Sequence, residues 1–207
     1  MRQDDLFRSD AEAAWPRGLR YEPDFLSAEE ERSLLATIAE VPFRHAQYRQ
    51  FVARRRTVSY GSGYDFQQQA RTPAPEIPRF LEPLRHRAAK WIGVDPTAFI
   101  QALVSEYQPG TPLGWHRDVP DYEDVVAISL MSACRIRFRR YPWNPAQKAD
   151  IVTLEPQPRS IYLLSGDARW KWQHSVPPVK ELRYSITFRT PRGHRGEAIH
   201  RAAEVGA

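Results

Sequence analysis

The chain has 207 residues, of which 42% are apolar and 27% charged, and these proportions are typical of one globular domain with a substantial core. With 30 basic and 25 acidic residues, its formal net charge is +5, which suits a nucleic-acid partner but equally suits an arginine-rich protein without one. The single cysteine, Cys134, excludes an intramolecular disulfide, and the lack of a long apolar run or an N-terminal apolar signal predicts a cytoplasmic protein without a membrane partner.

Two amphipathic helices are expected in the first half of the chain. Ser27 and Glu30 form a capping-box pattern, and apolar residues follow at helical spacing, so a helix is predicted over about 27–40. A second helix is predicted over about 77–92, where apolar residues again recur every three to four positions and a glycine follows. Pro83 lies early in this second segment, and we expect it to kink the helix.

From residue 99 onward, short apolar and β-branched runs alternate with proline and glycine, which is the pattern of strands and turns. The expected strands cover residues 100–107, 125–132, 136–140, 151–154, 160–164, 170–174 and 183–189. Two helices followed by many short strands predict an α+β protein whose core is a jelly roll.

His116 and Asp118 are candidate metal ligands. If their segment is a strand, both side chains point to the same side, with Cα atoms about 6–7 Å apart, and they can converge on one ion. His174 ends the expected strand 170–174 and can face them across a barrel. Two histidines and one carboxylate form the ligand set of non-haem Fe(II) oxygenases. A surface turn with a packed histidine is the alternative interpretation of these residues.

The segment 183–189 carries a second chemical signal, because its polar side chains share one face of the expected strand. That face carries Arg183, Ser185, Thr187 and Arg189. The opposite face, directed at the core, carries Tyr184, Ile186 and Phe188. The two arginine Cα atoms are about 20 Å apart, so their extended side chains can hold a small dicarboxylate between them. The alternative interpretation of this segment is an edge strand whose arginines face solvent. Burying a guanidinium without an anionic partner costs folding free energy, so an inward-facing pair requires a bound anion.

These motifs together resemble one known family. His116, Asp118, His174 and the sequence Arg-Tyr-Ser-Ile-Thr-Phe-Arg at 183–189 are similar to the motifs of the AlkB-type Fe(II)/2-oxoglutarate dioxygenases. Residues 103–110 resemble the strand and turn that precede the first metal ligand in that family. The motifs lie in the second half of the chain, where the strands are expected.

Two weaker similarities lie upstream. Residues 5–8 resemble the family's N-terminal segment, and residues 55–64 resemble its nucleotide-recognition lid. The resemblance implies a double-stranded β-helix (jelly-roll) core with N-terminal helices and such a lid. It also implies that residues 1–207 form a single domain. The implied parts are helices and substrate-recognition lid over 1–98, the jelly-roll catalytic core over 99–190, and a tail over 191–207.

The resemblance implies a role for each site residue. The implied Fe(II) ligands are His116, Asp118 and His174. Arg189 would hold the carboxylate of 2-oxoglutarate that chelates the metal, and Arg183 and Tyr107 would hold the far carboxylate. Ser185 stands where the family has a cosubstrate-binding asparagine, and because serine is shorter, its contact is expected through water. The third reactant is O2.

The implied reaction is oxidative dealkylation of N-alkylated bases in DNA, with RNA as an open alternative, and it releases aldehyde, succinate and CO2. The candidate nucleic-acid contacts are Arg55, Arg56, Tyr60, Tyr64 and Arg139. Pro120 replaces an acid by which some family members read the damaged base, so no lesion preference is predicted. The same chemistry on a modified tRNA, a protein or a small molecule is an alternative. A zinc hydrolase or a non-catalytic jelly-roll binding module is a third alternative, and the arginine pair argues against a hydrolase, which needs no dicarboxylate clamp. We expect a monomer.

Overall fold

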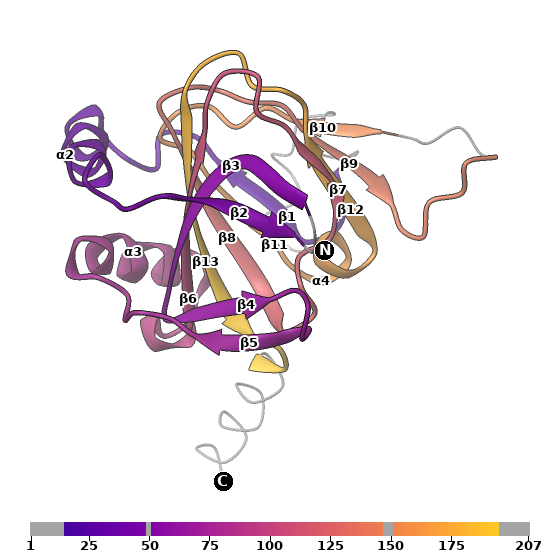
Figure 1. Ribbon diagram of the computed structural model, residues 1–207, viewed down its shortest axis with the longest axis horizontal. Coiled ribbons are helices and arrows are strands. Elements are labelled where there is room, and N and C mark those ends of the chain that lie inside the picture. Colours follow the sequence, from indigo (N-terminus) through magenta and orange to yellow (C-terminus); the bar gives the residue numbers. More distant parts are fainter. Residues whose placement is uncertain (1–14, 49–50, 147–150, 195–207) are drawn as a thin grey trace, which may run out of the picture.

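A computed structural model describes residues 15–48, 51–146 and 151–194, which form three layers (Figure 1). Helices α2 (Ala28–Ile38) and α3 (Glu82–Ile92) lie on one side, a seven-stranded sheet lies in the middle, and a four-stranded sheet lies on the other side. This arrangement confirms the α+β class with a jelly-roll core. The segment 5–8 and most of the expected tail lie outside the described residues.

The seven-stranded sheet joins strands from both halves of the chain. In order across the sheet, its strands are β1 (Leu19–Glu22), β11 (Ile161–Leu164), β8 (Tyr122–Leu130), β13 (Arg183–Pro191), β6 (Gln101–Tyr107), β3 (Phe51–Tyr60) and β2 (Arg44–Tyr48). The order in the four-stranded sheet is β10 (Val152–Leu154), β9 (Ile136–Arg140), β12 (Trp172–Val176) and β7 (Leu113–His116). Neighbouring strands pair antiparallel throughout both sheets. A separate hairpin consists of β4 (Ser62–Asp65) and β5 (Ala70–Pro73).

Both predicted helices are present, with small differences at their starts. In α2 the capping box is complete, because Ser27 accepts from the Glu30 backbone while the Glu30 carboxylate accepts from the Ser27 backbone. The second helix begins as a 3-10 turn over Arg79–Leu81 and continues as α3. Pro83 therefore lies in the first turn of α3, where no intrahelical N–H is needed, and the expected kink was wrong.

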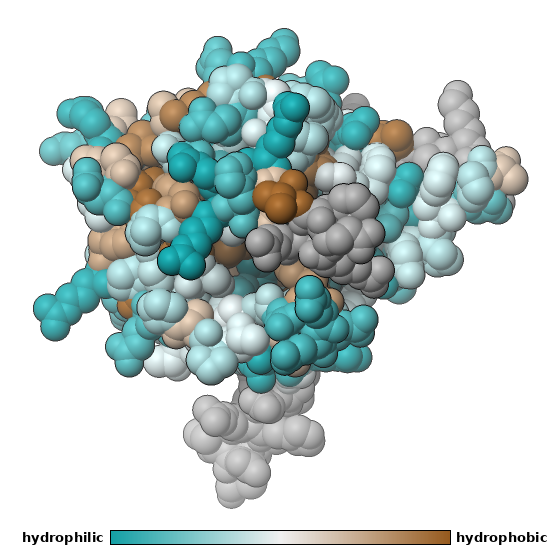
Figure 2. Space-filling view, in the orientation of Figure 1, coloured by the Kyte–Doolittle hydropathy of each residue, from teal (hydrophilic) through white to brown (hydrophobic). Residues whose placement is uncertain are grey.

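Two buried apolar clusters hold the three layers together. The first packs α2 and α3 against the seven-stranded sheet and includes Ile38 and Phe188, both 0% exposed. The second lies between the two sheets, and it contains Phe138 and, as a small core residue, Cys134. On the face of the molecule seen in Figure 2 hydrophilic side chains predominate, as expected when the apolar faces are turned inward. No helix in the described ranges is long and apolar enough to cross a membrane.

The expected strand 170–174 was wrong at its start. A short helix, α4 (Gly166–Trp170), precedes β12, so Trp170 and Trp172 do not share one strand face. The helix is held by a tertiary contact, because the buried Arg169 side chain donates to the carbonyls of Val119 and Tyr122. A contact between segments about fifty residues apart leaves no periodic signal in the local sequence.

The strands of the first half of the chain were not predicted. β1, β2 and β3 extend the seven-stranded sheet, although residues 1–98 were expected to hold helices and a lid. β3 was missed because the run Arg54-Arg55-Arg56 within it lacks the alternation of apolar and polar residues that is typical of a half-buried strand. Its polar residues are accommodated by partners across the sheet: Arg56 forms a two-bond ion pair with Glu106, with N–O distances of 2.7 and 2.8 Å.

Gly61 turns the chain from β3 into β4. Its φ is +73°, and a Cβ there would lie 2.4 Å from the carbonyl oxygen of Ile100. We expect Gly61→Ala to lower the free energy of unfolding by at least about 2 kcal/mol, because it adds a clash to the left-handed strain. Urea denaturation measures this loss. Gly93→Ala is the matched control, since Gly93 also has positive φ but open space around it, and a loss no larger than the control's would contradict the clash.

Candidate active site

Two histidines meet where two strands of the four-stranded sheet pair. His116 is the last residue of β7, and it lies opposite His174 of β12 in the antiparallel ladder. Their ring centroids are 4.2 Å apart, with an interplanar angle of 57°. The carbonyl oxygen of Gly114 lies 2.9 Å from Nδ1 of His116 and can only accept a hydrogen bond. Nδ1 therefore carries the proton, and Nε2 keeps its lone pair for a metal.

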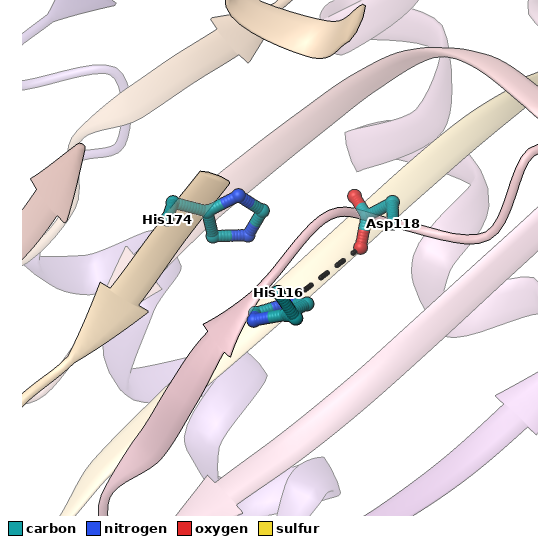
Figure 3. A group of neighbouring side chains, drawn as sticks. All are labelled: His116, Asp118 and His174. Atoms are coloured by element: carbon teal, nitrogen blue, oxygen red, sulfur yellow. Dashed lines mark ion pairs between the residues drawn. The ribbon is translucent and has the colours of Figure 1, made fainter. Parts of the chain in front are cut away.

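Asp118 completes the group from the loop that follows β7 (Figure 3). It does not continue the strand, as the two-residue spacing had implied, but its carboxylate still turns toward the histidines. Its Oδ1 lies 4.0 Å from Nε2 of His116, and one ligand atom from each of the three residues lies within 4.8 Å of the others. Two imidazoles and one carboxylate grouped in this way fit Fe(II) and leave further coordination positions open.

The electrostatics of the group suit metal binding. Burial, followed by the neighbouring ring of His116, lowers the pKa of His174 to about 3, and burial also lowers the pKa of His116. Both imidazoles are therefore neutral near pH 7, with a lone pair available. Burial alone would raise the pKa of Asp118, but the positive charges around it, led by the guanidinium of Arg189, together hold that pKa well below its usual range. Asp118 thus stays an anionic ligand.

The three side chains line a cavity between the two sheets. The predicted alternation along β13 is confirmed. Its cavity-lining side chains are Arg183, Ser185, Thr187 and Arg189. On the other face, Ile186 and Phe188 belong to the cluster under the helices. The two-residue period of the strand thus separates the core from the site.

The two arginines of β13 mark opposite ends of this cavity. At the metal end, Arg189 donates to Gln101 at 2.9 Å, and its Nη2 lies 3.3 Å from the Asp118 carboxylate. At the far end, Arg183 is 1% exposed, donates to Ser129 at 3.2 Å, and lies 5.1 Å from the ring centroid of Tyr107. Arg183 and Arg189 are six positions apart along the strand, which places their Cα atoms about 20 Å apart.

Two polar residues of this site were not predicted. Gln101 begins β6 on the side where Ser105 and Tyr107 line the cavity, so the alternation along β6 was a signal for it. Ser129 lies in β8, whose sequence is mostly apolar, and no local pattern distinguishes it. In the ladders, Ser185 lies opposite Ser105 on one side and Ser129 on the other, so a row of hydroxyls crosses the middle of the sheet.

A family match decides what this arrangement is. Residues 18–189 match the model of the 2OG-Fe(II) oxygenase superfamily. The chain belongs to this superfamily. The oxygenase is therefore an enzyme of the dioxygenase class that uses Fe(II), 2-oxoglutarate and O2, and its His-Asp-His group fits the metal.

Similar proteins place the oxygenase among AlkB homologues. It is 30% identical to the Alkylated DNA repair protein ALKBH8 homolog of Arabidopsis thaliana, over 86% of this chain and 59% of that protein. It is 26% identical to the Mus musculus tRNA (carboxymethyluridine(34)-5-O)-methyltransferase ALKBH8, over 81% of this chain and 25% of that protein. The chain thus spans less than two thirds of either relative. The solved structure of OsALKBH1 has the same fold, with a TM-score of 0.61 at 16% identity, covering 85% of this chain and 97% of that one.

The structure separates the predicted nucleic-acid contacts. Arg55 lines the cavity. Arg56 and Tyr60 lie on the opposite face of β3, where Arg56 pairs with Glu106 and Tyr60 packs against the cluster under the helices. These two side chains therefore do not join Arg55 at the cavity. In the β4–β5 hairpin, Tyr64 contacts the ring of Phe66.

Arg139, the last predicted contact, belongs to an aromatic stack on β9. Its guanidinium lies 4.4 Å from the ring of Trp115 and 4.4 Å from that of Trp143. Arg137 lies 5.1 Å from the same Trp115 ring. Trp115 is the residue before the metal ligand His116 in β7, so its side chain lies on the opposite face of the four-stranded sheet from His116 and the cavity.

Proposed function

We propose that this oxygenase oxidises an alkyl group on a nucleic-acid base, and that an N-alkylated base in DNA is its substrate. The group of His116, Asp118 and His174 beside the two-arginine strand carries the oxidative part of this proposal. When bound there, Fe(II) and 2-oxoglutarate would supply, with O2, the oxidation of an alkyl carbon, with 2-oxoglutarate converted to succinate and CO2. Loss of the hydroxylated carbon as an aldehyde would then restore the base.

The chain's own residues bind and orient the reactants in this proposal. Arg189 would bind the carboxylate of 2-oxoglutarate that chelates the metal, and it holds Asp118 through their 3.3 Å contact. Arg183 and Tyr107 hold the far carboxylate, which supplies the anion that the buried guanidinium of Arg183 needs. Ser185 contributes a hydroxyl between the two ends. We further propose that residues 1–207 act as one monomeric domain.

The stack of Trp115, Arg139 and Trp143 supports the nucleic-acid part of the proposal. Trp143 is 45% exposed, so one of its faces is available to a partner. A short distance along the chain, the ring of Tyr141, 43% exposed, lies 3.7 Å from the guanidinium of Arg117. Exposed rings beside guanidiniums provide base stacking and phosphate contact together, which is how single strands are bound without a fixed sequence.

A modified tRNA is the second candidate substrate. The names of the mouse and Xenopus tropicalis relatives, which are tRNA (carboxymethyluridine(34)-5-O)-methyltransferases, favour it. The name of the Arabidopsis relative favours DNA. Both candidate substrates would use the same site and the same stack, and they differ in whether DNA or tRNA carries the modified base.

One assay tests the proposal and separates the candidates. Iron-loaded protein is given 2-oxoglutarate and O2 with N-methylated single-stranded DNA, the same sequence in RNA, and a modified tRNA. Succinate and aldehyde are quantified, and the bases are analysed by mass spectrometry. We expect succinate release to rise with a modified strand and not with its unmodified copy. If iron is bound and no nucleic acid raises succinate release, the nucleic-acid substrate is wrong.

Removing the central guanidinium of the stack is expected to weaken strand binding. In Arg139→Met, we expect the Kd for a single-stranded oligonucleotide to rise roughly 5- to 50-fold, because stacking support and one charge contact are lost. The slope of log Kd against log salt should fall by about one unit. Fluorescence anisotropy over a salt series measures both quantities.

Arg135→Met is the matched control for this prediction. Arg135 precedes β9, is 62% exposed in its side chain, and pairs with Glu155 at 2.9 Å instead of with the tryptophans. The control keeps the same change in net charge. Equal weakening in both variants would show a general charge effect and contradict the role of the stack.

A further inference from the structure

Arg55 points into the active-site cavity, unlike its two arginine neighbours. It lies on β3, next to β6, and its Nη1 donates to the hydroxyl of Tyr107 at 3.3 Å. Because Arg56 lies opposite Glu106 in the β3–β6 ladder, the next pair along it is Arg55 and Tyr107. Arg54 is exposed, and Arg56 faces away toward Glu106. One member of the arginine run therefore belongs to the site.

Arg55 and Arg183 flank the same ring at one end of the cavity. Tyr107 lies opposite Arg183 in the β6–β13 ladder, so the three side chains form a row across three neighbouring strands. The guanidinium of Arg183 lies 5.1 Å from the Tyr107 ring centroid, and that of Arg55 lies 5.9 Å from it. This row lies at the start of β13, six positions along the strand from Arg189.

Among the residues that the structure describes, the two guanidiniums have no carboxylate partner. Within the described ranges, no carboxylate lies within 4.0 Å of a guanidinium nitrogen of Arg55 or Arg183. The Nε of Arg55 is buried and has no hydrogen-bond partner among those residues. Buried cations with unused donors are costly, and an anionic ligand removes that cost. The far end of the cavity is therefore built to receive an anion.

We propose that Arg55 is a second guanidinium for the far carboxylate of 2-oxoglutarate, acting with Arg183 and Tyr107. The inference rests on the proposed cosubstrate role of this cavity. It assigns Arg55 to cosubstrate binding, whereas the sequence placed it among the nucleic-acid contacts. Arg183 uses Nε on Ser129, and Arg55 uses Nη1 on Tyr107, so each keeps further donors for one carboxylate.

Cosubstrate selectivity follows from this arrangement. A ligand that keeps the 2-oxo acid end but lacks the second carboxylate leaves both guanidiniums without their anion. The contribution of Arg55 should then disappear, because it depends on the far carboxylate alone. 2-Oxopentanoate has the same chain length as 2-oxoglutarate but lacks that carboxylate. Measuring both acids with the unaltered protein and with the Arg55 variant isolates the contact between Arg55 and the far carboxylate, in the manner of a double-mutant cycle.

Calorimetry without turnover tests the proposal. Full-length protein is loaded with Mn(II) in place of iron under anaerobic conditions, and it is titrated with each of the two acids. In Arg55→Met, we expect the Kd for 2-oxoglutarate to rise about 10- to 100-fold, as for the loss of a charged hydrogen bond. The Kd for 2-oxopentanoate should change less than about twofold. Arg55→Lys, which keeps the charge, should recover part of the affinity.

Arg54→Met is the matched control, since it removes the neighbouring exposed arginine and should leave both Kd values unchanged. Circular dichroism and thermal unfolding show that each variant is folded, and Arg55→Lys gives the comparison if Arg55→Met does not fold. Equal weakening for both acids, or an unchanged Kd for 2-oxoglutarate with weaker oligonucleotide binding, would overturn the proposal. If the unaltered protein binds Mn(II) but not 2-oxoglutarate, the proposed function itself fails.

Discussion

Replacing Asp118 with alanine is expected to reduce 2-oxoglutarate turnover by at least about 100-fold. Replacing a residue that only hydrogen-bonds to a metal ligand already lowers metal affinity or activity about 10–100-fold. Asp118 is the one carboxylate of the His-Asp-His group, and its charge is held ionised against burial by Arg189. The substitution removes a metal ligand and leaves the Arg189 guanidinium without the anion 3.3 Å away. Both effects lower metal affinity.

Metal content and succinate release measure this effect together. Iron bound per protein is determined after dialysis against a weak chelator, and succinate is quantified in the same samples. Asp167→Asn is the control, since Asp167 pairs with Lys171 at 3.0 Å on the short helix α4 and its replacement removes the same charge. Full iron content and unchanged turnover in Asp118→Ala would contradict the metal assignment.

Replacing Phe188 with alanine is expected to lower the free energy of unfolding by about 3–5 kcal/mol. Phe188 is 0% exposed in the cluster between the helices and the seven-stranded sheet, and its ring centroid lies 5.4 Å from that of Phe99. Truncation removes buried apolar area and leaves a cavity that rigid neighbouring strands cannot fill. Urea denaturation at constant m-value gives the loss.

The same substitution is expected to alter the active site, because Phe188 lies on β13 between Thr187 and Arg189, whose side chains line the cavity. We expect the Kd for 2-oxoglutarate to rise in the folded variant as Arg189 loses its fixed position. Val52→Ala is the control for stability, since Val52 is 65% exposed on β3 and its truncation should cost less than about 0.5 kcal/mol. A loss below about 1 kcal/mol in Phe188→Ala would show that the cluster repacks.

Several elements could be predicted from the chain because their signals are local. The capping box at Ser27 and Glu30 predicted α2, and the run 136–140 predicted β9 with its observed bounds. The alternation of polar and apolar residues along β13 was enough to separate Arg183 and Arg189 from the core-facing side chains. In each case neighbouring residues carry the whole pattern, since a helix or strand period acts over a few positions.

Other features depend on partners far away in the chain. The strand β3 is stabilised by pairing with β6 about fifty residues later, so its arginine run gave no sign of a strand. The helix α4 depends on carbonyls of Val119 and Tyr122 that accept from Arg169. Prediction failed at these places because long-range contacts override local propensity.

The sequence by itself predicted the fold class, because helical periods and runs of short strands are local patterns, and short motifs pointed to the family and to the candidate residues His116, Asp118 and His174 with the arginine strand. Only the tertiary structure decided which side chains share the cavity. It brought His174 opposite His116 and turned Arg55 rather than Arg56 toward Tyr107. The physical reason is strand register: a shift of one residue moves a side chain to the other face of a sheet, and register is set by pairing between distant segments.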